Sequence, residues 1–295
     1  MYQGFININK PSGISSNNVL KHIKPHIRGS KIGFVGTLDP LASGVLPICI
    51  GFATRLSDLI SDPIKEYIFT GIFGTQTDTH DSEGKIINEC KYDHVTKKDL
   101  IAFLNKLKIN YDQEAPIFSA LKVNGKKMYE LARKGIEVKP KVRNVKLIDF
   151  EIIHFEKPTF QIKILCSKGF YVRSLIRDIG TNLRTFAHMT SLVRTKSSGF
   201  DISDAFSLDE IKYQIDIGNI KKLITPIDKL LTELKLINLN KIETTMILNG
   251  NALKKNLKGI NNDEKLIIFD EKSLIVAVGN YIDGSIFPIK VVAHD

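Results

Sequence analysis

The sequence contains no long run of apolar residues. Its longest apolar stretches are broken by Lys, Asp or Gly, so none approaches the length that a membrane-spanning helix needs. The first four residues, MYQG, lead directly into an alternating strand-like pattern, without the basic start or the apolar core of a signal peptide. These absences predict a protein that stays in the cytoplasm.

Cysteine is also scarce. The chain has three cysteines, Cys49, Cys90 and Cys166, which are far apart and form no CxxC motif. An odd number of isolated thiols argues against a disulfide framework and against a structural zinc site. Internal repeats and low-complexity tracts are absent as well.

Basic residues exceed acidic ones, 42 to 32, which gives a net charge of +10. The excess is spread over many short segments instead of being confined to a tail. This charge favours a polyanionic partner, and nucleic acid over a membrane surface, because no basic amphipathic helix stands out. A Lys-rich composition that merely aids solubility explains the charge equally well when it is considered alone.

The length of 295 residues suits one large and one small domain better than a single core. Along residues 1–233, strand and helix patterns mix without strict βαβ alternation, which predicts an α+β domain. After Leu230 the pattern changes to short β-type runs separated by Gly, Asn and Asp turns. We therefore expect a separate small β domain at residues 234–295.

Periodicity and turn residues predict the individual elements. We expect strands at residues 4–10, 45–50, 67–73, 119–123, 145–155, 160–167, 192–197, 265–269, 273–278 and 286–292, helices at 15–28, 96–107, 127–133 and 171–183, and an exposed acidic loop at 74–84.

The segment GTLDPLASGVL, residues 36–46, is the strongest candidate for a chemical site. A single carboxylate, Asp39, lies between two glycines that let a ligand approach the backbone closely, and Pro40 restricts the chain beside it. An Asp placed in this way suits a nucleophile or an acid–base group. For an arbitrary Asp-Pro pair, however, an ordinary turn is the more common explanation.

This segment is one of five motif-like segments along the chain. They are KPSGISS (10–16), GTLDPLASGVL (36–46), KEY (65–67) with GTQTDTHDSEG (74–84), SALKVNGKKMY (119–129) and SKGFYVRSL (167–175). In this order they resemble the motifs of the TruB family of tRNA pseudouridine-55 synthases, and the similarity extends across nearly the whole chain. One such match is weak evidence, whereas five in the family's order are specific.

The resemblance implies a fold and an activity. The fold is the pseudouridine synthase fold, a mixed and largely antiparallel sheet flanked by helices, with a small C-terminal PUA-like RNA-binding domain. The activity is the isomerisation of uridine to pseudouridine at position 55 in the T-loop of tRNA, without a cofactor or a metal, and assistance to tRNA folding can accompany it. The partner is the T-arm of tRNA, and we expect a monomer with no obligate protein partner.

The resemblance also implies three catalytic residues. Asp39 is the nucleophilic carboxylate that acts on the target uridine, either at the base or at C1′ of the sugar. Tyr67 stacks on the flipped base, and its phenol is a candidate for helping to remove the C5 proton. Arg173 pairs with Asp39, which keeps the carboxylate ionised and fixes its orientation.

Other residues have supporting roles by the same resemblance. Tyr171 and Leu192 line the base pocket, while Lys10 and Pro11 support the active-site loop. Phe34 is a departure, because the family usually has a His at this place, five residues before the nucleophile. A Phe can stack or wedge but cannot donate a hydrogen bond, so base extrusion differs in detail.

Basic residues around the Asn124-Gly125 turn predict a phosphate clamp for RNA. The clamp comprises Lys122, Lys126, Lys127, Arg133 and Lys134, with Arg143, Lys146, Lys168, Arg177 and Arg184 as additional members. Each of these is individually more often a solvated surface residue.

Three other functions were considered. Uridine C5 methylation needs a reactive Cys and a nucleotide-binding Gly loop, but Cys166 lies within a strand pattern and no such loop occurs. A phosphoaspartyl phosphatase needs a DxD motif after a strand, and DPL at residues 39–41 lacks it. An RNA-binding protein or tRNA folding chaperone without catalysis remains an alternative.

Overall fold

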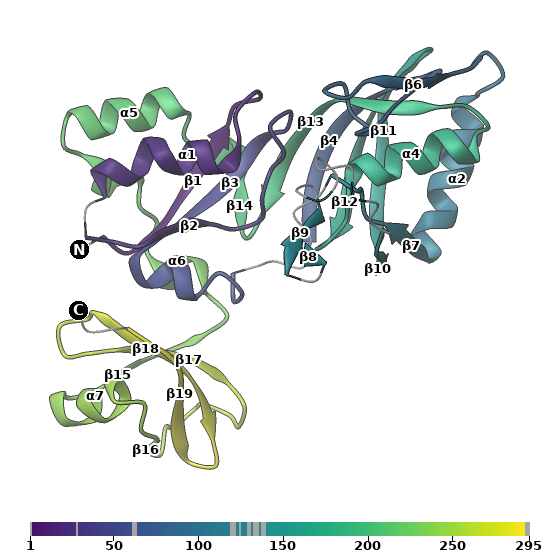
Figure 1. The fold of residues 1–295 in the computed structure, drawn as a ribbon. Helices are drawn as coiled ribbons and strands as arrows, with labels where there is room; N and C mark the ends of the chain where they lie inside the picture. The colour runs from purple at the N-terminus through teal and green to yellow at the C-terminus, as the bar shows by residue number, and fades with distance from the viewer. Residues whose placement is uncertain are drawn as a thin grey trace.

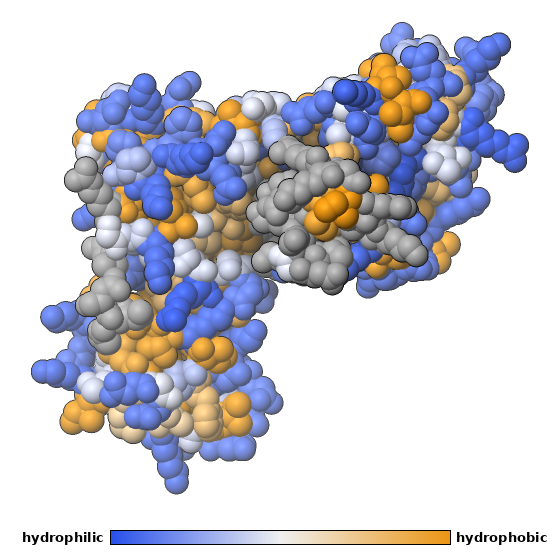
Figure 2. Space-filling view, viewed as in Figure 1, coloured by the Kyte–Doolittle hydropathy of each residue, from blue (hydrophilic) through white to orange (hydrophobic). Residues whose placement is uncertain are grey.

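The computed structural model describes residues 2–27, 29–60, 64–118, 122–123, 125–128, 131, 136 and 140–292. The chain forms a large α+β unit and a smaller β-rich unit, drawn in yellow-green below it in Figure 1. In the space-filling view the two units give an L-shaped outline, and hydrophilic residues cover most of the outer rim (Figure 2).

An eight-stranded sheet forms the centre of the large unit. Its main path is β1 (Gly4–Lys10), β3 (Ser43–Ile50), β13 (Ala187–Ser197), β4 (Ile64–Phe73), β12 (Thr159–Ser167) and β11 (Leu147–Glu156), with β2 (Ile32–Phe34) paired to β3 and β14 (Phe200–Asp201) paired to β13. Every pairing is antiparallel except that of β3 with β13. The predicted mixed, largely antiparallel sheet is therefore confirmed.

The parallel junction between β3 and β13 is short, with only two registered pairs, Val193 with Ser43 and Arg194 with Gly44. Beyond them the two halves of the sheet diverge. Gly44 is required at this junction, since a Cβ there would lie 2.2 Å from the Arg194 carbonyl oxygen and the backbone has φ +98°. The divergence leaves room for a site between the two halves.

Helices flank the sheet on both halves (Figure 1). The elements are α1 (Ser16–Ile23), α2 (Lys97–Ile109), α4 (Val172–Asn182), α5 (Leu208–Asp216) and α6 (Ile227–Leu230), with 3₁₀ helices Lys24–His26, Gly51–Arg55, Ile202–Asp204 and Ile220–Leu223. Side chains cap the starts of three of these α-helices: Ser15 accepts from the Asn18 amide, and capping boxes are formed by Thr96 with Asp99 and by Ser207 with Glu210. No helix among the described residues is both long and apolar enough to cross a membrane.

Three two-stranded sheets complete the large unit. They are β5 (Thr75–Thr77) with β6 (Ile86–Glu89), β7 (Tyr111–Glu114) with β10 (Val142–Val145), and β8 (Lys122–Val123) with β9 (Lys126–Lys127). The helix expected at residues 127–133 and the first half of the strand expected at 119–123 lie largely outside the described residues.

Two sequence predictions differ from the structure in an informative way. The helix predicted to reach residue 28 ends at Ile23 and continues as a 3₁₀ turn, because Pro25 lacks the amide that an α-helix needs. The segment 74–84 is not a fully exposed loop: it contributes β5, and Asp81 is 3% exposed. Its acidic composition suggested solvent, but Asp81 is satisfied by hydrogen bonds within the segment.

The small unit is a five-stranded sheet with one helix. The strand order is β15 (Lys235–Asn238), β17 (Lys265–Phe269), β18 (Ile275–Ile282), β19 (Ser285–Val291) and β16 (Leu253–Lys254), and the helix is α7 (Lys241–Leu248). Side chains alternate along β17: Leu266 and Ile268 enter the core of the small unit, while Ile267 packs in a cluster with Phe5 and Phe52 of the large unit. Apolar packing on one face of the sheet thus joins the two units, while the other face belongs to the core of the small unit.

We predict that Gly44→Ala lowers the free energy of unfolding by at least about 2 kcal/mol more than Gly218→Ala does, because overpacking at the β3–β13 junction adds to the backbone strain. Gly218 is the matched control, since it has φ +70° but no heavy atom within 4 Å of an added Cβ. Urea unfolding followed by circular dichroism measures the difference. Equal losses in the two variants would contradict the close approach at Gly44.

Candidate active site

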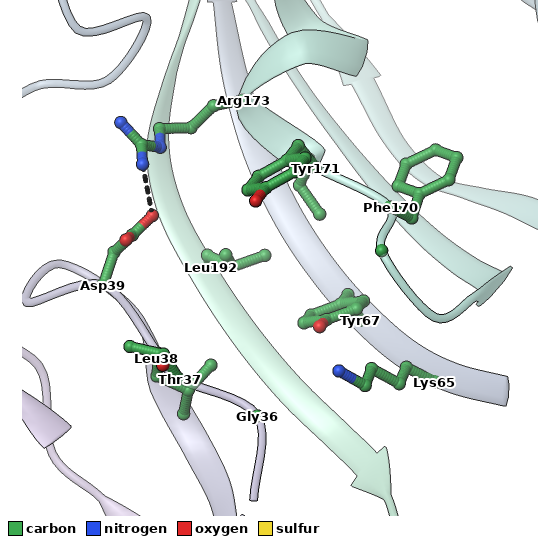
Figure 3. A pocket seen from close by; sticks show the side chains of 12 residues that line it. Gly36, Thr37, Leu38, Asp39, Lys65, Tyr67, Phe170, Tyr171, Arg173 and Leu192 are labelled. Carbon is green, nitrogen blue, oxygen red and sulfur yellow. Dashed lines mark ion pairs between the residues drawn. The ribbon is translucent and has the colours of Figure 1, made fainter. Parts of the chain in front are cut away.

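A cavity of about 280 Å³ opens where the two halves of the sheet diverge. Figure 3 shows its walls: the loop before β3 on one side, β4 and β13 behind, and the start of α4 on the other side. The cavity is lined by Gly36, Thr37, Leu38, Asp39, Lys65, Tyr67, Gly169, Phe170, Tyr171, Val172, Arg173 and Leu192. The structure therefore brings together five of the residues selected from the sequence, namely Asp39, Tyr67, Arg173, Tyr171 and Leu192.

Asp39 and Arg173 form an ion pair across the cavity. The Arg173 Nη2 atom lies 2.8 Å from Asp39 Oδ2. The Arg173 side chain is only 6% exposed, whereas that of Asp39 is 39% exposed. A buried guanidinium thus orients a carboxylate that remains accessible from the cavity, which is the arrangement that a reactive carboxylate needs.

Arg173 is held by further contacts. Nη2 donates to the Phe118 carbonyl at 2.8 Å and Nη1 donates to the Thr79 carbonyl at 3.3 Å. Nη1 also lies 3.6 Å from the Asp81 carboxylate, whose other oxygen accepts from the Thr79 hydroxyl at 2.6 Å and the Glu83 amide at 3.1 Å. Arg173 is therefore placed between two carboxylates, of which the sequence analysis identified only Asp39.

Lys10 stabilises the loop that carries Asp39. Its ammonium is fully buried and donates to three carbonyls, those of Pro11 at 2.8 Å, Ile14 at 2.6 Å and Pro40 at 3.2 Å. Burial lowers the pKa of Lys10 to about 8, although the charges of Asp39 and Glu83 oppose this shift. Pro11 is exposed and contributes its carbonyl.

Neighbours of Lys10 in the sequence hold the same loop. The Ser16 hydroxyl bonds both the amide and the carbonyl of Leu38 at 2.9 Å, and the Ser12 hydroxyl donates to the Leu41 carbonyl at 2.7 Å. The Gly13 amide donates to the Pro40 carbonyl at 2.8 Å. The segments KPSGISS and GTLDPLASGVL are thus one structural unit, although about 20 residues of chain separate them.

Tyr67 and Leu192 lie on the two adjacent strands behind the cavity, β4 and β13, and are 7% and 8% exposed. Burial raises the pKa of the Tyr67 phenol, and the nearby Arg194 guanidinium opposes this rise. The phenol therefore stays protonated at neutral pH. Its ring and the Leu192 side chain form an apolar floor of the cavity (Figure 3).

Two cationic side chains at this floor were not selected from the sequence. Arg194, the register partner of Tyr67, is fully buried and donates to the Val45 carbonyl at 2.8 Å and the Gly36 carbonyl at 2.7 Å. A Cβ on Gly36 would lie 3.1 Å from both Arg194 Nη1 and Lys65 Nζ, so two positive charges flank this glycine. Only two features of the sequence pointed to these residues: Arg194 follows Leu192 by two residues, and Lys65 is the first residue of the KEY motif.

Lys65 extends into the cavity (Figure 3). Burial lowers its pKa to about 8, and the positive charges of Arg194 and Lys168 lower it further, while Cys166 opposes them. Its neighbour Glu66 pairs with Lys163 at 3.2 Å. In the described part of the chain, Lys65 has no carboxylate partner.

A second cavity, of about 270 Å³, lies on the other side of the Asp39–Arg173 pair. Phe34 lines this second cavity and not the first. The departure from the family's usual His thus falls beside the ion pair, outside the space that holds Tyr67.

The predicted phosphate clamp is only partly within the described residues. Lys122, Lys126 and Lys127 lie on the β8–β9 hairpin, but nothing is described of their side chains, and Arg133 and Lys134 lie outside the described residues. Arg177 is occupied by other groups: it lies 2.7 Å from Asp178 and 3.6 Å from Glu114.

The structure also bears on the methylation hypothesis. Cys166 is fully buried on β12, and burial raises the pKa of its thiol to about 12, so it lacks the thiolate that attack on a pyrimidine requires. Among the described residues, no group of three or more His, Cys, Asp or Glu side chains is arranged to hold a metal ion.

Solved structures resemble this fold over nearly its whole length. The structure of a Cbf5-Nop10-Gar1 complex matches with a TM-score of 0.69 and 24% identity, covering 98% of this chain and 85% of that chain. An H/ACA RNP bound to a substrate RNA containing 2′-deoxyuridine matches with a TM-score of 0.68 and 22% identity, covering 99% and 85%. At these identities the similarity establishes the fold, including a C-terminal PUA-like β domain.

Sequence relatives are more similar. The tRNA pseudouridine synthase B of Clostridium kluyveri is 38% identical over 96% of this chain and 93% of its own length, and that of Lactobacillus gasseri is 40% identical over 87% and 88%. Residues 24–172 match the TruB family pseudouridylate synthase N-terminal domain, and residues 173–232 match the tRNA pseudouridylate synthase B C-terminal domain. The chain belongs to the TruB family of pseudouridylate synthases.

Proposed function

We propose that this protein isomerises uridine to pseudouridine at position 55 in the T-loop of tRNA. Membership of the TruB family and relatives named tRNA pseudouridine synthase B support the proposal. The observation that carries it is the Asp39–Arg173 ion pair, which lies at one cavity with Tyr67 and Leu192. The reaction breaks the C1′–N1 bond and forms a C1′–C5 bond, while C5 loses a proton and N1 gains one, so there is no net oxidation or reduction.

Asp39 is the proposed nucleophile, acting on the base or on C1′ of the sugar. The reaction needs a group that retains one fragment while the base rotates, and a covalent bond to a carboxylate does so. Because Arg173 is buried and has a fixed hydrogen-bond set, its charge is already oriented toward Asp39 before substrate binds.

Tyr67, Tyr171 and Leu192 are proposed to hold the flipped uracil. The neutral Tyr67 phenol stacks on the ring, and its oxygen is close to Arg194, whose charge favours the phenolate. Removal of the C5 proton by Tyr67 would therefore draw on Arg194 to offset the burial that raises the pKa of the phenol.

RNA recognition is proposed to involve both units. Flipping a stacked base out of the T-loop costs a few kcal/mol, which contacts to the backbone must offset. The net charge of +10, the β8–β9 hairpin at residues 122–127 and the β unit at residues 234–295 are the proposed sources of these contacts. We further propose that the enzyme works as a cytoplasmic monomer, that residues 1–233 are its catalytic domain, and that residues 234–295 bind RNA.

We predict that Asp39→Asn lowers single-turnover pseudouridine formation by at least about 10³-fold, because the amide is not a nucleophile. The dissociation constant for tRNA should change by less than about threefold, since the substitution preserves the shape of the loop. Product is measured by base-resolved mapping and binding by filter retention. Unchanged product formation would remove Asp39 from the chemistry. A wild-type protein that binds tRNA but forms no pseudouridine would contradict the proposed function and favour a chaperone.

We predict that Arg173→Ala lowers turnover by about 100-fold or more, because Asp39 loses its orienting partner and Asp81 is left buried without a cation. Asp81→Asn removes one of the two carboxylates while keeping the contacts of Thr79 and Glu83, so its loss of turnover should be smaller. Single-turnover rates at saturating enzyme separate these effects from binding. Turnover of Arg173→Ala equal to wild type would eliminate its proposed role.

We also predict a pH-dependent contribution of Lys65 to tRNA binding. Its ammonium, with a pKa of about 8, is charged at pH 7 and loses its proton as the pH rises, so its attraction for RNA is present below pH 8 and lost above it. In an Asp39→Asn background, Lys65→Met should weaken binding about fivefold at pH 7 but little at pH 9.

Lys65→Arg is the matched control, because its charge does not titrate in this range. The ratio of the dissociation constants of Lys65→Met and Lys65→Arg should therefore be the same at pH 7 and pH 9. Lys10 also has a pKa of about 8, but it titrates equally in all variants, so the change with pH in the ratio of the dissociation constants of Lys65→Met and the parent protein isolates Lys65. Equal affinities of Lys65→Met and the parent protein at pH 7 would show that Lys65 does not face the RNA.

A further inference from the structure

A buried glutamine connects strand β7 to the cavity. Residues along β7 alternate between buried and exposed, so Tyr111 and Gln113 are buried, with exposures of 4% and 1%, while Asp112 and Glu114 face solvent. Within the described residues β7 pairs with β10 alone, and its buried side chains bond Tyr171 at the start of α4 and Asp178 within that helix. This helix carries Arg173.

The carboxamide of Gln113 bonds both backbone groups of Tyr171. Its Oε1 accepts from the Tyr171 amide at 2.7 Å, and its Nε2 donates to the Tyr171 carbonyl at 2.9 Å. Nε2 also donates to the Tyr111 hydroxyl at 3.1 Å. Both amide hydrogens and the amide oxygen are thus used, and the orientation of the amide is fixed, because the Tyr171 amide needs an acceptor.

These bonds affect the cavity because of the position of Tyr171 in the chain. Tyr171 is the N-cap of α4, and its own side chain makes no capping hydrogen bond. It lies two residues before Arg173 and lines the cavity with Phe170 (Figure 3). A shift of this helix start would move both the base pocket and the partner of Asp39.

Tyr111 reinforces Gln113 from two directions. Its hydroxyl donates to Asp178 Oδ2 at 2.6 Å, further along α4, and its ring packs edge-on against Phe170 with centroids 5.6 Å apart. Burial and the Asp178 charge raise the pKa of Tyr111, so the hydroxyl stays a donor. The Tyr111–Gln113 pair therefore holds residues 170–171 and helix α4 in a fixed relative position.

We propose that Gln113 is a positioning residue for the reaction: it fixes the backbone of Tyr171, and through it the base pocket and the register of Arg173 with Asp39. This inference rests on the proposed function. Gln113 does not line the cavity, so it acts through Tyr171 and does not touch the substrate.

The decisive variant is Gln113→Glu, because its protonation state switches the hydrogen bonds. A protonated carboxyl group reproduces the acceptor for the Tyr171 amide and a donor for the Tyr171 carbonyl. An ionised carboxylate instead places a negative charge against the oxygens of the Tyr171 carbonyl and the Tyr111 hydroxyl. Its single-turnover rate, divided by that of wild type at the same pH, should therefore fall as the pH rises from 6 to 8.5.

Gln113→Met, of similar size but without hydrogen bonds, should lower the single-turnover rate about 10- to 100-fold at all pH values, with the dissociation constant for tRNA within about threefold of wild type. Gln161→Met is the matched control, since Gln161 is a half-buried glutamine on β12 that bonds Thr70 and lies away from the cavity. Its rate should equal that of wild type.

Two outcomes overturn the proposal: a Gln113→Met rate equal to wild type, or a Gln113→Glu variant whose pH profile parallels wild type. If Gln113→Met does not fold, Gln113→Glu at pH 6 and Tyr111→Phe test the proposal. Tyr111→Phe should show an intermediate loss of rate, because it keeps the ring that packs on Phe170. A wild-type protein that forms no pseudouridine would count against the proposed function instead. The two failures are therefore distinguishable.

Discussion

The site depends on the burial of one guanidinium. Arg173 is only 6% exposed, and a cation removed from water in this way is stable only if its donors and its charge are satisfied. Two carbonyls and two carboxylates do so, and they come from three separate segments: the Asp39 loop, residues 79–81 and Phe118. Because these partners surround the cation, none can move without leaving it under-satisfied. The contacts that the buried cation requires for stability therefore also hold the Asp39 carboxylate in place.

The geometry of the sheet explains why the cavity lies where it does. A sheet that was continuously paired from β1 to β11 would have no room for a base, but β3 and β13 share only two registered pairs. Glycines have two different tasks here: Gly44 permits the close approach of the two backbones where they pair, and the missing side chain of Gly36 leaves space for Lys65 and Arg194. The loop that carries Asp39 then crosses this gap, supported by the buried ammonium of Lys10 and by Ser16. Leu38 and Ala42 of the same loop are buried in the hydrophobic core, so polar contacts to carbonyls and apolar packing fix the loop together.

More of the sheet than of the site was predictable from the sequence. Alternation and turn residues located most strands, because burial on one face leaves a periodic signal; β17 was predicted at the residues where it occurs. The grouping of Asp39, Tyr67, Arg173, Tyr171 and Leu192 came from the family resemblance alone, since no local pattern states which distant segments meet. For the same reason, the sequence did not indicate Asp81, Arg194 or Gln113 as site residues. In a sequence, a buried polar residue cannot be told from a surface residue unless its partners are known. The bonds that hold Arg173, Gln113 and Arg194 reach partners 55 to 158 positions away in the chain.

The charges around the cavity divide into two regions with different tasks. At one end, Arg173 lies between Asp39 and Asp81, so its positive charge is compensated in the free protein. At the other end, Lys65 Nζ and Arg194 Nη1 both lie beside Gly36, and Lys65 has no carboxylate partner in the described part of the chain. Burial and the charge of Arg194 lower the pKa of Lys65 to about 8. Under the proposed function, the RNA supplies the negative charge that this end lacks, which would tie the stabilisation of that end to substrate binding.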